Sequence, residues 1–131
     1  MKNAGVGFYL LHIADSCEKV LRYLRDVERA EFVRNQLGQD AVLRNFEIIG
    51  EAAKHVPDDF RIRHSEINWR GMAGLRDILI HEYFGIDLVN VWNISKNAMP
   101  ETLKALRNLP EYTEARNSLA ESEKLSGPHG V

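Results

Sequence analysis

The sequence predicts an all-α protein, an antiparallel bundle of four to five helices, on three observations. Apolar residues recur at every third or fourth position through long parts of the chain, which is the period of a helix with one buried side. Proline, glycine and capping residues stand at the ends of these parts, and no part alternates apolar and polar residues as a strand would. The chain has 131 residues, 44% of them hydrophobic, which is enough for one domain with one core.

The first helix is expected from Leu10 to Val27. Its apolar residues follow one another at spacings of three and four: Leu10, Ile13, Cys17, Val20, Leu24 and Val27. Cys17 is the single cysteine of the chain, so it cannot form an internal disulfide. Its place on the apolar side predicts a buried thiol and not a catalytic one.

The second helix follows a short polar stretch at residues 28–38. Its apolar side is formed by Val42, Phe46, Ile49, Ala53 and Val56. Pro57 ends this helix because proline lacks the backbone donor that a helix interior needs. Residues 58–68 show neither a helical nor a strand period, so we expect a loop there with room for one helical turn.

The third and fourth helices are expected on either side of Gly85. Asn68 is a suitable N-cap for a helix that begins near Trp69, and Gly85 is a natural stop after it. Asp87 caps the last helix, which is expected to kink or break at Pro100. Its common side carries Leu88, Trp92, Ser95, Met99, Leu103 and Leu106.

The domain organisation follows from where this pattern fades. We assign residues 1–110 to one helical domain and residues 111–131 to a polar, partly disordered tail. No apolar run approaches the ~20 residues that span a bilayer, and the first residues lack the grading of a signal peptide, so a cytoplasmic protein is expected. The formal net charge of −2 provides no overall field for nucleic acid, so RNA binding would depend on a local basic patch.

Candidate catalytic residues crowd the end of the third helix, in residues 76–83. Asp77 and His81 are four residues apart on one side of the helix, so the carboxylate can fix the tautomer of the imidazole. Arg76 lies about 140° from His81 on a straight helix of ~3.6 residues per turn. Two copies of this helix that face each other in a symmetric dimer would bring both pairs to one cleft.

These residue types suit RNA cleavage without a metal. The reaction needs a base for the ribose 2′-OH, an acid for the leaving oxygen and positive charge near the phosphorus. One histidine and one arginine are too few for this, but two chains supply enough. No metal site or cofactor is expected, because His81 has no second histidine at the spacing of a zincin helix and the other histidines show no ligand spacing.

The same spacing also fits plainer roles. His81 fits a surface histidine that helps to end a helix, and Arg76 fits one half of an exposed ion pair. Tyr83 fits a ring that packs on the bundle with its hydroxyl in water. Composition and periodicity therefore leave the choice between an enzyme and a structural domain open.

Residues 76–83 resemble the Arg-x-x-x-x-His-x-Tyr signature of the HEPN superfamily, specifically of the HepT-like proteins encoded beside MntA-type minimal nucleotidyltransferases. Residues 39–54 are similar to the second helix of that family, and residues 67–75 to its approach to the motif. The resemblance covers about residues 10–109. Asn68 departs from the pattern, which has proline before the tryptophan.

The resemblance implies a homodimeric bundle of HEPN type that acts as a metal-independent endoribonuclease, with Arg76 and His81 as the catalytic residues. It also implies the toxin of a type VII-like toxin–antitoxin pair. In such a pair the cognate nucleotidyltransferase, the antitoxin, silences the RNase by transferring AMP to Tyr83.

Four further residues are candidates to support the cleft: Asp77, Asn45, Glu47 and Glu51. The last three belong to the second helix and can also serve in helix solvation or in a buried polar network. The main alternative function is a non-catalytic HEPN subunit that binds nucleotide or docks a nucleotidyltransferase. A structural helical adaptor is the more remote alternative.

Overall fold

The structure is a computed structural model that describes residues 4–81 and 86–126. All regular secondary structure in these residues is helical, which confirms the predicted fold class. The elements are α1 (Ala4–Tyr23), α2 (Arg29–Arg34), α3 (Gln36–Lys54), α4 (Asp58–Arg63), α5 (Trp69–His81), α6 (Leu88–Asn93), the π-helical turn η1 (Ile94–Ala98), α7 (Met99–Arg107) and α8 (Pro110–Ser126). In this part of the chain no helix is both long enough and apolar enough to cross a membrane.

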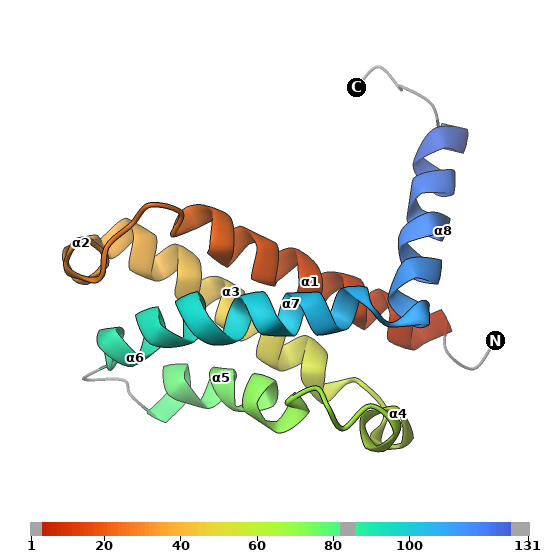
Figure 1. Cartoon of the computed structure of the whole chain (residues 1–131), viewed down its shortest axis with the longest axis horizontal. Coiled ribbons are helices and arrows are strands. Elements are labelled where there is room, and N and C mark those ends of the chain that lie inside the picture. The colour runs from red at the N-terminus through yellow and green to blue at the C-terminus, as the bar shows by residue number, and fades with distance from the viewer. Residues whose placement is uncertain (1–3, 82–85, 127–131) are drawn as a thin grey trace.

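Four long segments form the body of the molecule: α1, α3, α5 and the continuous run of α6, η1 and α7. Successive segments run in opposite directions (Figure 1). Helix α3 packs against both α1 and α5, and α7 packs against α1. Helix α3 therefore lies between α1 and α5, the arrangement that positions the candidate site.

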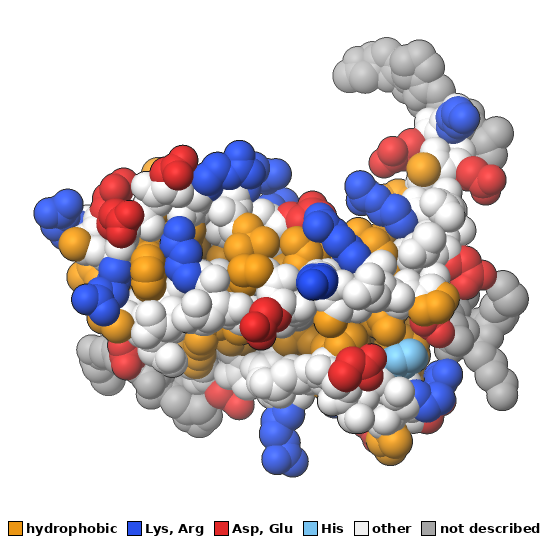
Figure 2. Space-filling model, viewed as in Figure 1, with side chains coloured by type: hydrophobic (Ala, Val, Ile, Leu, Met, Phe, Trp, Pro, Cys, Tyr) orange, Lys and Arg blue, Asp and Glu red, His pale blue; other side chains and the backbone are white. Residues whose placement is uncertain are grey.

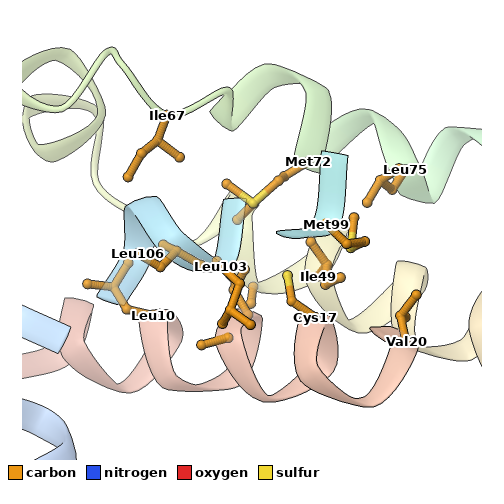
Figure 3. Close-up of a cluster of buried hydrophobic side chains, with 14 of the residues drawn as sticks. Leu10, Cys17, Val20, Ile49, Ile67, Met72, Leu75, Met99, Leu103 and Leu106 are labelled. Atoms are coloured by element: carbon orange, nitrogen blue, oxygen red, sulfur yellow. The ribbon is translucent and has the colours of Figure 1, made fainter. Parts of the chain in front are cut away.

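The core lies where these four segments meet (Figure 3). The side chains labelled there come from α1 (Leu10, Cys17, Val20), α3 (Ile49), the approach to α5 (Ile67), α5 itself (Met72, Leu75) and α7 (Met99, Leu103, Leu106). The apolar sides predicted from the period thus face the core, with Leu88 and Trp92 only partly buried. Val27 is partly buried but lies beyond the end of α1.

Two predicted N-caps are confirmed by hydrogen bonds. The Oδ1 of Asn68 accepts from the backbone N–H of Gly71 at 2.9 Å, at the start of α5. The Oδ1 of Asp87 accepts from the N–H of Asn90 at 3.0 Å, at the start of α6. These bonds satisfy donors that the first turn of a helix leaves without a partner. The stop expected at Gly85 lies outside the described residues.

Short helices occupy two regions that the sequence predicts to be irregular. Residues 28–38 contain all of α2 and the first turn of α3, and α4 takes up half of residues 58–68. Each short helix is held by a single buried aromatic ring, Phe32 in α2 and Phe60 in α4. A helix of six residues with one buried side chain shows no period, so the pattern missed α2 and allowed for only one helical turn where α4 lies.

Pro100 does not break the last long helix. The helix widens before it into η1, where the backbone N–H of Met99 donates to the carbonyl of Ile94, five residues back. Pro100 then stands in the first turn of α7, where a missing N–H costs little. Of the kink or break expected at Pro100 there is thus no break: the helical path continues through a local π-helical turn just before it.

Residues 110–126 form α8, whereas the sequence suggests a polar tail from residue 111. Helix α8 rises from the end of the body (Figure 1), and Tyr112 in its first turn is buried. Gly7 permits a close approach to α1, because a Cβ at this position would lie 2.8 Å from the Cβ of Ala115. Most of the helix is exposed, so it carries almost no apolar period.

The Cys17 thiol is expected to be inert in the folded protein. Burial in the core, with a smaller contribution from the Glu18 carboxylate, raises the pKa of Cys17 to about 12. The reactive thiolate is therefore much rarer at pH 8 than it is for an exposed cysteine. We predict that a chromogenic disulfide reagent labels native protein only as fast as the protein unfolds, but labels one thiol per chain at once in denaturant. Rapid labelling of native protein would contradict the buried position.

Candidate active site

An open groove of about 700 Å³ lies between α1, α3 and α5. Its lining residues are Phe8, Tyr9 and His12 from α1, Arg44, Glu47, Ile48, Glu51 and Ala52 from α3, His55 just after α3, and Arg76 and Leu79 from α5. This volume is within the range of sites that bind small molecules. The groove also combines aromatic, acidic and basic side chains, which a purely apolar packing defect would not.

The α3 wall of the groove is one continuous stripe of the helix. Residues 44, 47, 48, 51, 52 and 55 follow one another at spacings of three, one, three, one and three, so they share a side. The adjacent stripe, which includes Phe46 and Ile49, is buried in the core. The same amphipathic pattern that anchors α3 therefore also presents its charged residues to the groove.

Gly50 lets α5 approach α3 closely at Arg76. A Cβ at position 50 would lie 3.0 Å from the Cβ of Arg76 and 3.1 Å from its backbone nitrogen. A larger residue would push the two helices apart at this point. Gly50 therefore lets the backbone of Arg76 lie close to α3. The residue that follows Gly50 on α3 is Glu51.

Glu51 links two basic side chains of the groove. Its Oε2 lies 3.1 Å from Nη1 of Arg76, and its Oε1 lies 3.5 Å from Nε2 of His55. The Arg76 and Glu51 side chains are 40% and 52% exposed, and an ion pair this exposed contributes less than about 1 kcal/mol to stability. The main effect of this ion pair is therefore to orient the guanidinium of Arg76.

A second guanidinium lines the same groove. Nη1 of Arg44 lies 2.6 Å from Oε1 of Glu47. A guanidinium has five N–H donors in a planar fork, so a single carboxylate oxygen leaves donors for a phosphate. Figure 2 shows charges of both signs intermixed on the face that it presents, so binding of an anion would depend on such local groups.

The α1 wall of the groove is aromatic. Phe8 lies edge-on to His12 with ring centroids 4.4 Å apart. Tyr9 is stacked on His55 across the groove lining, with centroids 5.3 Å apart and planes 14° apart. Sequence reasoning missed Phe8 and Tyr9, because the first helix was expected to begin at Leu10 whereas α1 begins at Ala4. The spacing of four from Phe8 to His12, and from Glu51 to His55, could have paired these residues within each helix but not across the groove.

Of the four residues predicted to support the site, two line the groove and two do not. Glu47 and Glu51 line the same groove as Arg76. Asn45 does not line it: the side chain is buried, and its Nδ2 donates to the carbonyl of Ala41 at 2.8 Å. Asp77 is exposed and is also not part of the groove lining.

The structure does not describe the side chains of two predicted residues, His81 and Tyr83. The backbone of His81 forms the last position of α5, but its side chain and all of Tyr83 lie outside the described residues. Within the described residues, no three or more His, Cys, Asp or Glu side chains come together in a way that could hold a metal ion.

Comparison with known proteins identifies the family. The family model "Ribonuclease HepT-like" matches residues 13–109. No solved structure matches the chain.

Several proteins that are similar to this chain have names that describe them as ribonucleases. "Putative RNase MJ1380" of Methanocaldococcus jannaschii is 39% identical over 79% of this chain and 95% of its own length. "Probable ribonuclease HepT" of Thermococcus cleftensis is 44% identical over 70% of this chain and 84% of its own length. "Putative RNase TTE0752" of Caldanaerobacter subterraneus subsp. tengcongensis is 38% identical over 77% and 90%. This chain belongs to the HepT-like ribonuclease family of the HEPN superfamily.

Proposed function

We propose that this chain is an endoribonuclease that cuts RNA without a metal ion, and that it acts as the toxin of a toxin–antitoxin pair. The observation that supports this most is the position of Arg76. It lies in an open groove, beside Gly50 on α3, with its guanidinium held by Glu51. A buried structural arginine would not combine this access with a single exposed carboxylate partner.

In the proposed reaction His81 transfers protons and Arg76 stabilises charge. A histidine takes the proton from the ribose 2′-OH, and the oxygen attacks the adjacent phosphorus. The P–O5′ bond breaks, and an imidazolium returns a proton to the departing oxygen. Arg76 donates hydrogen bonds to the phosphoryl oxygens as their negative charge grows. Glu51 is a positioning residue, because it contacts the guanidinium and not the reacting atoms.

Product chemistry tests this proposal. We expect purified protein to cut single-stranded RNA in the presence of EDTA and to leave 2′,3′-cyclic phosphate and 5′-hydroxyl ends, since the attacking oxygen comes from the ribose. Binding of RNA or nucleotide with no cleavage would support the alternative, a non-catalytic nucleotide-binding or docking subunit. Cleavage that stops in EDTA would contradict the metal-independent mechanism.

A homodimer is part of the proposal, since one chain contributes one Arg76 and one His81 to a reaction that needs an acid, a base and positive charge. We predict that sedimentation shows a dimer at micromolar concentration. We also predict that mixing an excess of His81→Ala chains with wild-type chains lowers the activity per wild-type chain, because mixed dimers lack one imidazole. A fully active monomer would overturn the shared cleft.

Tyr83 is the proposed point of control by a cognate minimal nucleotidyltransferase antitoxin. Transfer of AMP to its hydroxyl would add a negative phosphodiester and a bulky adenosine two residues from His81, where both would hinder an RNA phosphate. We predict that Tyr83→Phe keeps its RNase activity but is not inhibited by the nucleotidyltransferase and ATP. Mass spectrometry should find the added AMP on wild-type Tyr83. Equal inhibition of the phenylalanine variant would rule out this residue as the switch.

A further inference from the structure

We infer that the aromatic wall of the groove is a nucleobase subsite, in which Phe8 seats an unpaired base of the RNA next to the phosphate held at Arg76. The identity of the ligand as RNA rests on the proposed function. The subsite itself rests on the placement of Phe8, Tyr9, His12 and His55 in the groove lining.

Phe8 is unusual among the apolar residues of α1. The side chains of Val6, Leu10 and Ile13 on the same helix are buried in the core, whereas Phe8 is 58% exposed. An exposed phenylalanine contributes little to folding, because its apolar surface stays in water. Its open position in a groove gives it a surface on which a planar group can stack.

The neighbouring rings hold this surface in place. His12 lies against Phe8 at a centroid distance of 4.4 Å, and Phe8 is also edge-on to Tyr9 at 5.8 Å. Tyr9 is in turn stacked on His55. These distances are typical of favourable aromatic contacts, and contacts that already hold the rings lower the conformational entropy lost on binding.

Helices α3 and α5, which form the rest of the groove, carry the groups that a nucleotide would need beside its base. Arg76 and Arg44 both line the groove, and a guanidinium fork fits the oxygens of a phosphate. A ligand with a flat, stackable ring and an anionic phosphate matches both walls at once. Single-stranded RNA is such a ligand, and its bases stack on aromatic side chains.

The subsite also predicts which RNA is cut. Bases within a duplex are stacked on one another and cannot lie on a protein ring, so only bases in single strands, loops or ends can enter. We therefore expect cleavage next to unpaired nucleotides. This preference arises from Phe8 and its neighbours and not from the proton-transfer chemistry.

A binding cycle tests the subsite separately from catalysis. The probe is a single-stranded RNA oligonucleotide with 2′-fluoro substitution, which lacks the attacking hydroxyl, and a series of copies in which one position at a time is abasic. Wild-type protein should bind one copy of the series more weakly than the intact probe, by roughly 5- to 150-fold, as expected for loss of one base–aromatic stack. Phe8→Ala should weaken binding of the intact probe to a similar extent, with no further loss for that abasic copy.

Three further variants make the result specific. Phe8→Trp should restore binding because it keeps an aromatic face, and Phe8→Leu should not restore it fully. Ile62→Ala is the matched control, since Ile62 is an exposed apolar residue of α4 that does not line the groove. It should bind every probe as wild type does.

Each other outcome overturns a stated part of the account. Equal losses at all abasic positions, or losses that add fully to that of Phe8→Ala, would exclude the subsite. A change in sedimentation of Phe8→Ala without a base-dependent change in binding would assign Phe8 to contact between protein chains. If Phe8 is coupled to one base but the protein cuts no RNA, the proposed function is overturned and the subsite stands. If wild-type protein does not bind the probe, the proposed function and the subsite are both overturned.

Discussion

Replacing Arg76 by alanine is expected to slow RNA cleavage by about 10²–10³-fold, the usual cost of removing a group that stabilises charge in a transition state. The rate should fall because the phosphoryl oxygens lose a fork of N–H donors that Gly50 and Glu51 hold in the groove. Arg76→Lys should recover only part of the rate, since an ammonium keeps the charge but not the planar fork. The measurement is the initial rate with saturating single-stranded RNA.

The fold should survive this substitution. The ion pair with Glu51 is exposed and contributes less than about 1 kcal/mol, so the melting temperature should change little. Arg63→Ala is the matched control: Arg63 lies on α4, outside the groove, in an exposed pair with Asp59. If Arg76→Ala and Arg63→Ala cut RNA equally well, the guanidinium in the groove has no catalytic part.

Phe46→Ala should lower the free energy of unfolding by about 3–5 kcal/mol, the range for a large aromatic side chain removed from a core. Phe46 is fully buried on α3, the helix that packs against both α1 and α5. Leu37→Ala, on the same helix but 80% exposed, should change stability by less than about 0.5 kcal/mol. Urea denaturation followed by circular dichroism measures both variants.

The comparison of these two variants tests the placement of α3. Both changes shorten an apolar side chain on one helix, so helix propensity alone would make them similar. If Leu37→Ala cost as much as Phe46→Ala, the buried side of α3 would be assigned incorrectly, and the charged stripe in the groove with it.

The long helices could be predicted from the sequence because each buries a stripe several turns long. The caps at Asn68 and Asp87 could also be predicted, since they depend only on neighbouring residues. The short helix α2 could not, and no more than one turn was expected where α4 lies, because each depends on one buried ring and on tertiary contacts. Helix α8 was missed for a related reason: only its first turns pack on the body, through residues such as Tyr112.

The candidate site was predictable only in part. Glu47 and Glu51 follow from the helical stripe that they share, and the same reasoning explains why Asn45 lies elsewhere: it is three residues after Val42 and four before Ile49, on the buried side. The aromatic wall depends on how α1 packs against α3, and sequence spacing within one helix does not reveal such a contact between helices. Phe8 and His55 are brought to one groove only by the fold.

The most direct test of the central claim is the rate of RNA cleavage in EDTA by wild-type protein and by His81→Ala, each purified as a folded protein of the same oligomeric state. The account predicts that wild type leaves 2′,3′-cyclic phosphate ends and that His81→Ala is slower by about 10²–10⁴-fold, the range for loss of a general acid or base. Cleavage by His81→Ala at the wild-type rate would contradict the account.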